Sequence, residues 1–124
     1  MSMRPTEITL HQKSRNLELT YEDGKAFSLP AEFLRVLSPS AEVRGHTPGS
    51  GKLQIGKENV AIKDIEPIGN YAIRIIFDDN HDSGIYDWDY LYDLGVKQDA
   101  YWEDYLQQLK AAGHERKAPD TDII

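Results

Sequence analysis

Residues 81–95, HDSGIYDWDYLYDLG, bring together the side chains of this sequence that are best suited to chemistry. The stretch contains one histidine, four aspartates and four aromatic residues. Imidazole and carboxylate groups can hold zinc or ferrous iron, and with a serine hydroxyl they can also form a hydrolytic triad. The same residues can instead cover a protein interface or complete a hydrophobic core. Each interpretation makes a different demand on the surrounding structure.

His81, Asp82 and Ser83 are neighbours in the sequence, which is unfavourable for a serine hydrolase. A triad requires the nucleophile, the base and the acid to converge in space, with the acid orienting the histidine. Along an extended segment alternate side chains point to opposite faces. His81 and Ser83 therefore share a face, and Asp82 cannot orient His81. The glycine-flanked serine of α/β-hydrolases is also missing, and we expect no catalytic residues and no enzyme.

A metal site would draw on His46 and His81, with Asp78, Asp79 and Asp82 as neighbouring carboxylates. No two histidines have the i, i+2 or i, i+4 spacing that places two ligands on one strand or helix. A lone histidine beside aspartates is more often a hydrogen-bonded residue at the end of a strand. Metal binding by His81 and His46 is therefore the alternative interpretation and not the leading one.

The segment RGHTPGSGK, residues 44–52, superficially resembles a phosphate-binding loop. That loop needs a glycine, four residues, and then Gly-Lys-Ser/Thr. Here five residues separate Gly45 from Gly51, and Leu53 stands where a hydroxyl residue would hold magnesium. The segment is predicted to be a flexible loop and not a nucleotide site.

Aromatic residues are dense in the second half of the chain, and most are predicted to be core because each can bury a large area. At helical spacing Trp88 and Tyr92 share a face while Tyr90 lies on another, so some rings are expected to be exposed. Exposed aromatics rimmed by acidic residues suit a protein interface. The seven aromatics lie within twenty residues: Tyr86, Trp88, Tyr90, Tyr92, Tyr101, Trp102 and Tyr105.

The hydrophobic periodicity predicts the elements that must position these residues. It indicates one α+β domain over residues 1–113, with a small, mostly antiparallel sheet and two to three short helices, followed by a disordered tail at 114–124. Asp87 is predicted to cap a helix that Gly95 closes. The predicted strands cover 6–21 with a turn at 14–16, then 26–30, 53–56, 59–69, a central strand at 71–79 and a return over 81–86; the predicted helices cover 31–37, 87–94 and 99–112.

Composition narrows the classes of partner. The chain has 124 residues, no cysteine and a formal net charge of −7. Without cysteine there are no disulfides and no thiolate ligands, which is compatible with the cytoplasm, where we expect the protein. Nucleic acid and anionic membranes bind through dense positive charge, so neither is an expected partner. A basic protein surface suits this charge better.

Three stretches resemble one known family of domains. They are PTEITLHQKSRNLELTYEDG at 5–24, LRVLSPSAEVRGHTPG at 34–49 and NYAIRIIFDDNHDSGIYDWDYLYDLG at 70–95. The sequence is similar to the N-terminal domain of gamma-butyrobetaine hydroxylase, which also occurs as small stand-alone bacterial proteins. The resemblance implies a small mixed α+β fold and not the double-stranded β-helix that holds the hydroxylase's catalytic iron and 2-oxoglutarate.

In the hydroxylases the similar domain binds a structural zinc through three cysteines, in a Cys-x-Cys-x-x-Cys run, and one histidine. The resemblance places the cysteine positions on Ser38, Ser40 and Val43, and the histidine on His81. Serine hydroxyls do not replace thiolates as zinc ligands. We therefore expect no cofactor, with zinc or iron as the alternative, and we expect His81 to hydrogen-bond across the loop that zinc would otherwise fasten.

The resemblance extends to domains appended to Mrp-type P-loop ATPases that carry iron–sulfur clusters. It implies a non-catalytic accessory domain that binds a protein partner, such as an iron–sulfur carrier ATPase or a metalloenzyme. The residues expected to bind that partner are Arg44, His81, Asp82, Tyr86, Trp88 and Tyr90.

Overall fold

The computed structural model describes residues 4–44 and 51–116, and its N-terminal part is an antiparallel sheet. Leu17 and Leu19 alternate with polar residues and are fully buried, which places one face of the sheet in the core. Gly24 adopts a φ of +86° in the second turn, a conformation that glycine reaches without strain. The strands lie in the order β1 (Pro5–His11), β2 (Asn16–Tyr21) and β3 (Ala26–Pro30).

A second antiparallel sheet follows the first along the chain. Its central strand is rich in isoleucine, and Ile73, Ile75 and Phe77 on one face are buried. The opposite face carries Arg74, which lies between Glu66 and an exposed isoleucine on the two neighbouring strands. The strands lie in the order β4 (Ile62–Ile68), β5 (Ala72–Phe77) and β6 (Ile85–Asp87).

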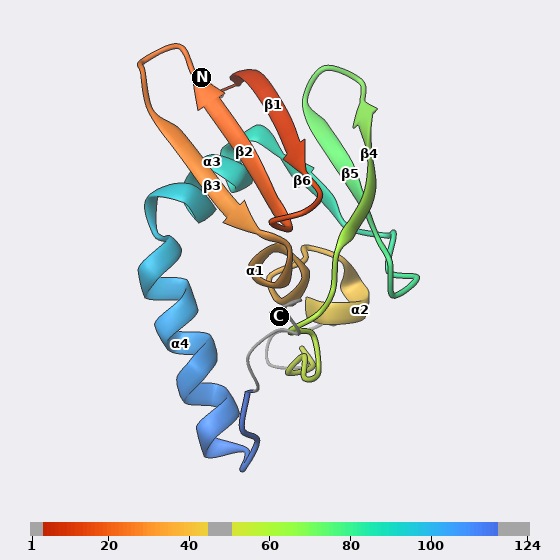
Figure 1. Ribbon diagram of the computed structural model, residues 1–124, viewed down its shortest axis with the longest axis vertical. Coiled ribbons are helices and arrows are strands. Elements are labelled where there is room, and N and C mark those ends of the chain that lie inside the picture. Colours follow the sequence, from red (N-terminus) through yellow and green to blue (C-terminus); the bar gives the residue numbers. More distant parts are fainter. Residues whose placement is uncertain (1–3, 45–50, 117–124) are drawn as a thin grey trace.

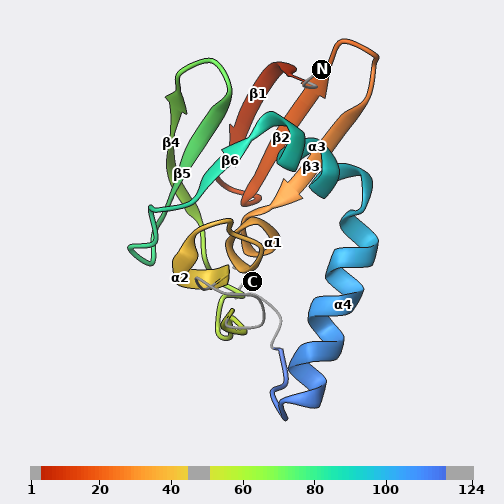
Figure 2. The same cartoon turned by 180° about the vertical axis from the view of Figure 1, so that it is seen from behind.

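Four helices are present in the described part of the chain: α1 (Ala31–Val36), α2 (Ala41–Arg44), α3 (Trp88–Val96) and α4 (Gln98–Ala111). Asp87 caps α3 as predicted, because its carboxylate accepts the backbone N–H of Tyr90 at 2.7 Å. Figures 1 and 2 show α3 covering one face of the β1–β3 sheet, with α1 below the ends of both sheets. The helix α4 projects beyond them.

One hydrophobic core joins the two sheets to α1 and α3. A smaller cluster holds α4 against the end of α1 through Val36, Tyr105 and Leu109. The main core therefore fixes the loops that connect α1 to α2 and β5 to β6, and these loops carry the candidate site. Its larger fully buried members are Leu17, Leu19, Tyr21, Leu29, Phe33, Leu34, Ile75, Phe77, Tyr86, Leu91 and Leu94.

The predicted α+β class is confirmed, and so are most elements. Four details were wrong. The strands form two sheets and not one, residues 53–56 form no strand, and the short helix α2 had not been predicted. Gly95 does not close α3, which continues to Val96. A Cβ at Gly95 would lie 2.3 Å from a ring carbon of Phe27, so the glycine permits close contact between α3 and β3.

The C-terminal segment begins after Gly113, which has a φ of +77° and ends α4 as predicted. Residues 114–116 still contact α1, through Arg116, so packing continues beyond the predicted domain end. The rest of the predicted tail, 117–124, lies outside the described residues. Within the described residues, no helix has the length and apolar character needed to cross a membrane.

Candidate functional site

Two loops meet beside the core. The first leads from α1 into α2, and the second connects β5 to β6. The second loop turns at Asn80, which has a φ of 70°, and it places the side chain of His81 inside the protein with 4% of the residue exposed. The His81 backbone accepts the N–H of Phe77 at 3.0 Å and donates to Asp79 Oδ1 at 3.3 Å. These bonds fix the backbone of His81, and the contacts of its imidazole come from the first loop and α2.

Hydrogen bonds between side chains join the two loops. His81 Nε2 lies 2.8 Å from Ser38 Oγ, and His81 Nδ1 lies 3.1 Å from Glu42 Oε2. Ser40 Oγ lies 2.7 Å from Ser83 Oγ. Each of the first two serines also accepts a backbone N–H two residues further on, at 3.2 Å. We call these five residues the serine–histidine cluster.

A neutral imidazole satisfies both of its contacts. When Nδ1 carries the proton it donates to Glu42, and Nε2 accepts the hydroxyl of Ser38. Burial lowers the pKa of His81 below its usual value, and the nearby charge of Arg35 lowers it further, while Glu42 opposes both effects. The folded protein therefore favours the uncharged ring.

A charged group anchors the histidine loop from the other side. Asp79 accepts a hydrogen bond from Arg35 Nε at 2.9 Å and from Lys57 Nζ at 2.7 Å. Burial alone would raise the pKa of Asp79, but the hydrogen bonds from Lys57 and Arg35 outweigh it and lower the pKa below the usual value. The β5–β6 loop is thus tied to α1 as well as to the loop before α2.

Ser38, His81 and Glu42 are connected in the order of a hydrolytic triad, a set that sequence reasoning missed. Ser38 is only 1% exposed. A Cβ added to Gly84 would lie 2.5 Å from Ser38 Oγ, so the backbone at Gly84 already covers the hydroxyl. An acyl carbon cannot approach this oxygen without moving the loop, and the arrangement fits a structural fastening better than nucleophilic catalysis.

The four positions that the family resemblance aligns with zinc ligands lie in one region. Ser38 and His81 are in direct contact, Ser40 is bound to the same loop through Ser83, and Val43 is buried on α2. The prediction that His81 hydrogen-bonds across this loop is confirmed. Within the described residues, no three histidine, cysteine, aspartate or glutamate side chains form a cluster that could hold a metal ion. His46 lies outside the described residues.

The expected docking surface needs correction, because half of its residues are buried. Tyr86 is 0% exposed, and its hydroxyl donates to the Leu34 carbonyl at 2.5 Å. Trp88 is also buried, and its indole N–H donates to the Asn70 carbonyl at 2.8 Å. The side chain of His81 is enclosed in the serine–histidine cluster. Residues with these internal partners stabilise the fold and cannot face a partner.

The other expected docking residues lie at the surface. Arg44 is exposed on α2, and its guanidinium lies 4.8 Å from the centre of the Tyr90 ring. Tyr90 is half-buried, with its hydroxyl donating to the Leu37 carbonyl at 2.5 Å. Asp82 is exposed, and 69% of the Glu42 side chain is exposed. We call the side chains of Glu42, Arg44, Asp82 and Tyr90 the Arg44 surface.

The serine–histidine cluster fixes the positions of these charged groups. Glu42 is itself held by His81, and Ser40 at the start of α2 is held by Ser83. Arg44 lies two residues after Glu42 on α2, and its guanidinium stacks on Tyr90 of α3. Arg44 of α2 and Tyr90 of α3 thus meet at the surface, and the cluster joins α2 to the loop that carries the exposed Asp82.

The fold defines a small α+β domain built on two three-stranded antiparallel sheets, and the sequence comparison identifies the family. Residues 8–92 match the family described as "Gamma-butyrobetaine hydroxylase-like, N-terminal", and the chain belongs to it. The resemblance seen in the sequence is thereby confirmed. No protein with a curated description matches the chain.

Solved structures support the same assignment. Two proteins solved by NMR in solution share 48% and 44% sequence identity with this chain, with TM-scores of 0.81 and 0.80. The first match covers 100% of this chain and 97% of the other, and the second covers 99% and 92%. A crystal structure from Acidithiobacillus ferrooxidans, of a DUF971 family protein with unknown function, is 34% identical with a TM-score of 0.64. That match covers 75% of this chain and 93% of the other.

Proposed function

We propose that the protein is a non-catalytic accessory domain that binds another protein through the Arg44 surface. The proposal rests on the connection between the buried serine–histidine cluster and the charged side chains at the surface. The cluster around His81 buries its serine hydroxyl and engages both imidazole nitrogens. On its outer side His81 holds Glu42, and Arg44 on the same short helix stacks on Tyr90.

The chemistry of the Arg44 surface indicates the kind of partner. Arginine and tyrosine are the side chains most enriched at the energetic centres of interfaces. Arg44 is stacked on Tyr90, so less conformational entropy is lost when a partner binds it. Glu42 lies on the same short helix as Arg44, and Asp82 lies on the loop that the cluster joins to that helix. A protein surface with both a carboxylate for Arg44 and basic groups for the acids would complement this arrangement.

We further propose that the partner is an iron- or metal-linked enzyme or an iron–sulfur assembly protein, such as an iron–sulfur carrier ATPase, and that the two meet in the cytoplasm. This part of the proposal rests on family membership. The family takes its name from the N-terminal domain of a hydroxylase, and the absence of cysteine from this chain leaves any cluster or thiolate site to the partner.

Metal binding by His81 and His46 is the competing function. A metal ion at His81 would have to displace Ser38 or Glu42 from the ring nitrogens. That exchange would break the connection between the two loops. Metal content therefore separates the two functions, because the accessory domain needs none and the alternative needs one ion for each chain.

The proposal is tested by affinity capture from the native host, followed by binding measurements with the purified partner. The decisive variant is Arg44→Glu, which reverses the charge at the surface and leaves the buried cluster intact. Lys63→Glu is the matched control, since Lys63 is an exposed cation on β4. The free energy of unfolding of both variants should lie within about 0.5 kcal/mol of the wild-type value, as is usual for surface substitutions.

The account predicts that Arg44→Glu weakens binding of the partner at least about tenfold while Lys63→Glu leaves it unchanged. A partner that binds both variants equally well would refute the Arg44 surface. Turnover of a substrate by the purified protein, abolished by Ser38→Ala, would instead refute the non-catalytic role.

A further inference from the structure

A second feature, on the opposite side of α1, resembles a receptor for an arginine side chain. Glu32 lies in the first turn of α1 and is 6% exposed. Its two carboxylate oxygens each accept from Arg116, one from Nε at 2.7 Å and one from Nη2 at 2.5 Å. This paired geometry is specific to the planar guanidinium group, and an ammonium group cannot reproduce it.

An aromatic wall completes the receptor. The guanidinium carbon of Arg116 lies 5.2 Å from the centre of the Trp102 ring, within the range of a cation–π contact. Trp102 is itself held in place by Phe33 and Tyr105, with ring centres 6.3 and 5.2 Å away. The buried carboxylate and the packed indole belong to α1 and α4, so both recognition groups are rigid. We call Glu32 and Trp102 the arginine pocket.

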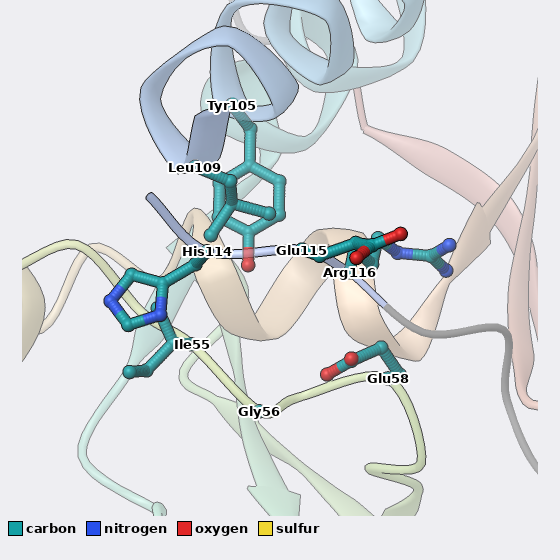
Figure 3. A pocket seen from close by; sticks show the side chains of 8 residues that line it. All are labelled: Ile55, Gly56, Glu58, Tyr105, Leu109, His114, Glu115 and Arg116. Carbon is teal, nitrogen blue, oxygen red and sulfur yellow. The ribbon is translucent and has the colours of Figure 1, made fainter. Parts of the chain in front are cut away.

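Open space lies on both sides of the bound arginine. One hollow of about 250 Å³ is lined by Pro30, Glu32, Phe33, Gln98, Trp102 and Arg116. The other, of about 300 Å³, lies between α4 and residues 55–58 (Figure 3). Tyr105 and Leu109 form one wall of it, and Arg116 lies at its edge. Residues 114–116 line the second hollow as well, so a peptide that displaces Arg116 would find room for its flanking residues in the first hollow and in the space that residues 114–116 leave.

The present occupant follows α4 and belongs to no helix or strand. Gly113 ends α4 and reverses the chain, and Arg116 follows three residues later. The Arg116 side chain is 27% exposed, whereas that of Glu32 is 7% exposed. The carboxylate is thus the fixed partner and the arginine the displaceable one. Release of Arg116 would break the contacts of the Arg116 side chain and would leave the hydrophobic core closed.

We propose that the arginine pocket recognises an exposed arginine in a peptide segment of a partner protein, and that Arg116 is an internal competitor that occupies the pocket in the free domain. The net charge of −7 favours a basic partner. This pocket and the Arg44 surface lie at different places, so the inference does not rest on the proposed function.

The test is an NMR titration with the peptide acetyl-Gly-Arg-Gly-amide. Otherwise identical peptides with lysine or citrulline at the central position serve as probes of charge and shape. Three forms are compared: wild type, Arg116→Gln, and Arg116→Gln combined with Glu32→Gln. Arg74→Gln is the matched control, because Arg74 forms an ion pair with Glu66 on the exposed sheet face.

Removal of the internal competitor should tighten peptide binding about tenfold in Arg116→Gln relative to the wild type and Arg74→Gln. The indole signal of Trp102 and the amide signals of α1 should shift. The lysine and citrulline peptides should bind more weakly, and Glu32→Gln should abolish the gain. If Arg116→Gln does not fold, Arg116→Lys keeps the charge and should show a smaller gain at the same signals.

Equal affinity for wild type and for both Arg116 variants would overturn the proposal, as would shifts confined to other surfaces. A lysine peptide that binds as well as the arginine peptide would reduce the pocket to a nonspecific acidic site and also overturn it. Sedimentation provides the last check. A wild-type dimer that dissociates on Arg116→Gln would assign the pocket to a second copy of this chain and not to a partner.

Discussion

The serine–histidine cluster and the arginine pocket both join distant parts of the chain through buried polar groups, but they do so in different ways. In the cluster, Ser38 and His81 are 43 residues apart and both are supplied by loops that the core anchors. In the pocket, Glu32 and Arg116 are 84 residues apart, and the arginine lies in the segment that follows α4. The cluster joins an imidazole to hydroxyls and to the Glu42 carboxylate, and the pocket uses a paired contact between a guanidinium and a carboxylate.

This difference separates a fastening from a contact that can be exchanged. Breaking the cluster leaves buried groups on both loops without partners, which is costly because water cannot reach them. Releasing Arg116 leaves only one buried carboxylate without its partner, and any other guanidinium can replace that partner. The same protein can therefore hold one site permanently closed and another open to competition.

The largest expected effect on stability comes from truncating a large side chain of the main core. Trp88→Ala should lower the free energy of unfolding by roughly 3–5 kcal/mol, because Trp88 is buried and its N–H is bound to the Asn70 carbonyl. Tyr71→Ala is the control, since Tyr71 is 57% exposed. Denaturant unfolding gives the free energy of unfolding of both variants. A stable Trp88→Ala that loses only partner affinity would restore Trp88 as a docking residue.

The cluster itself is tested by His81→Ala. We expect a loss of about 2–3 kcal/mol in the free energy of unfolding, because Ser38 is left buried with its hydroxyl partner removed. His11→Ala is matched in residue type but breaks only an exposed pair with Glu18, and it should cost less than about 1 kcal/mol. Equal costs for the two substitutions would show that the cluster fastens nothing.

The ion pair is tested by Arg116→Gln, with Arg74→Gln as the control. Glu32 stays buried when Arg116 is removed, and the expected loss is about 2 kcal/mol. The pair between Arg74 and Glu66 is more exposed and should contribute less than about 1 kcal/mol. A guanidinium denaturant complicates chemical unfolding of a protein with an arginine ion pair, so the free energy of unfolding is better measured by thermal denaturation. A larger loss for Arg74→Gln would contradict the distinction between the two pairs.

The smallest expected effect is a pH dependence that belongs to the cluster alone. The pKa of His81 is lowered in the folded protein, so the unfolded chain binds the proton first as the pH falls below about 6.5. Stability should be complete above that value and should decline until the pH reaches the lower folded pKa. His81→Gln should lack this decline. Stability that rises between pH 7 and pH 5 would mean that His81 is charged in the fold.

Sequence patterns predicted the parts of this molecule that depend on local periodicity. Alternation predicted β2 and β5, and Asp87 marked the start of α3, because strands and capped helices bury residues in a regular order. The helix α2 was missed because four residues are too few to show a helical period. Residues 53–56 were assigned wrongly because apolar residues in a short stretch do not require a partner strand.

The candidate site was only partly predictable, because its contacts are long-range. The family resemblance aligned Ser38, Ser40 and His81, and the structure joins Ser38 to His81. Nothing in the sequence marks Glu42 as the second partner of the imidazole, since it lies 39 residues away. Tyr86 appeared suited to docking because aromatics serve both interfaces and cores, and only its burial decides between them.

The most direct test of the central claim is the metal content of the purified wild-type protein, measured together with its unfolding free energy before and after chelator treatment. The account predicts zinc and iron far below one ion for each chain and no change in stability on chelation. The combined variant Ser38→Cys, Ser40→Cys and Val43→Cys should bind one zinc and become more stable with it. Near-stoichiometric zinc or iron in the wild type, lost on His81→Ala, would show that the hydrogen-bonded cluster is not what fastens these loops.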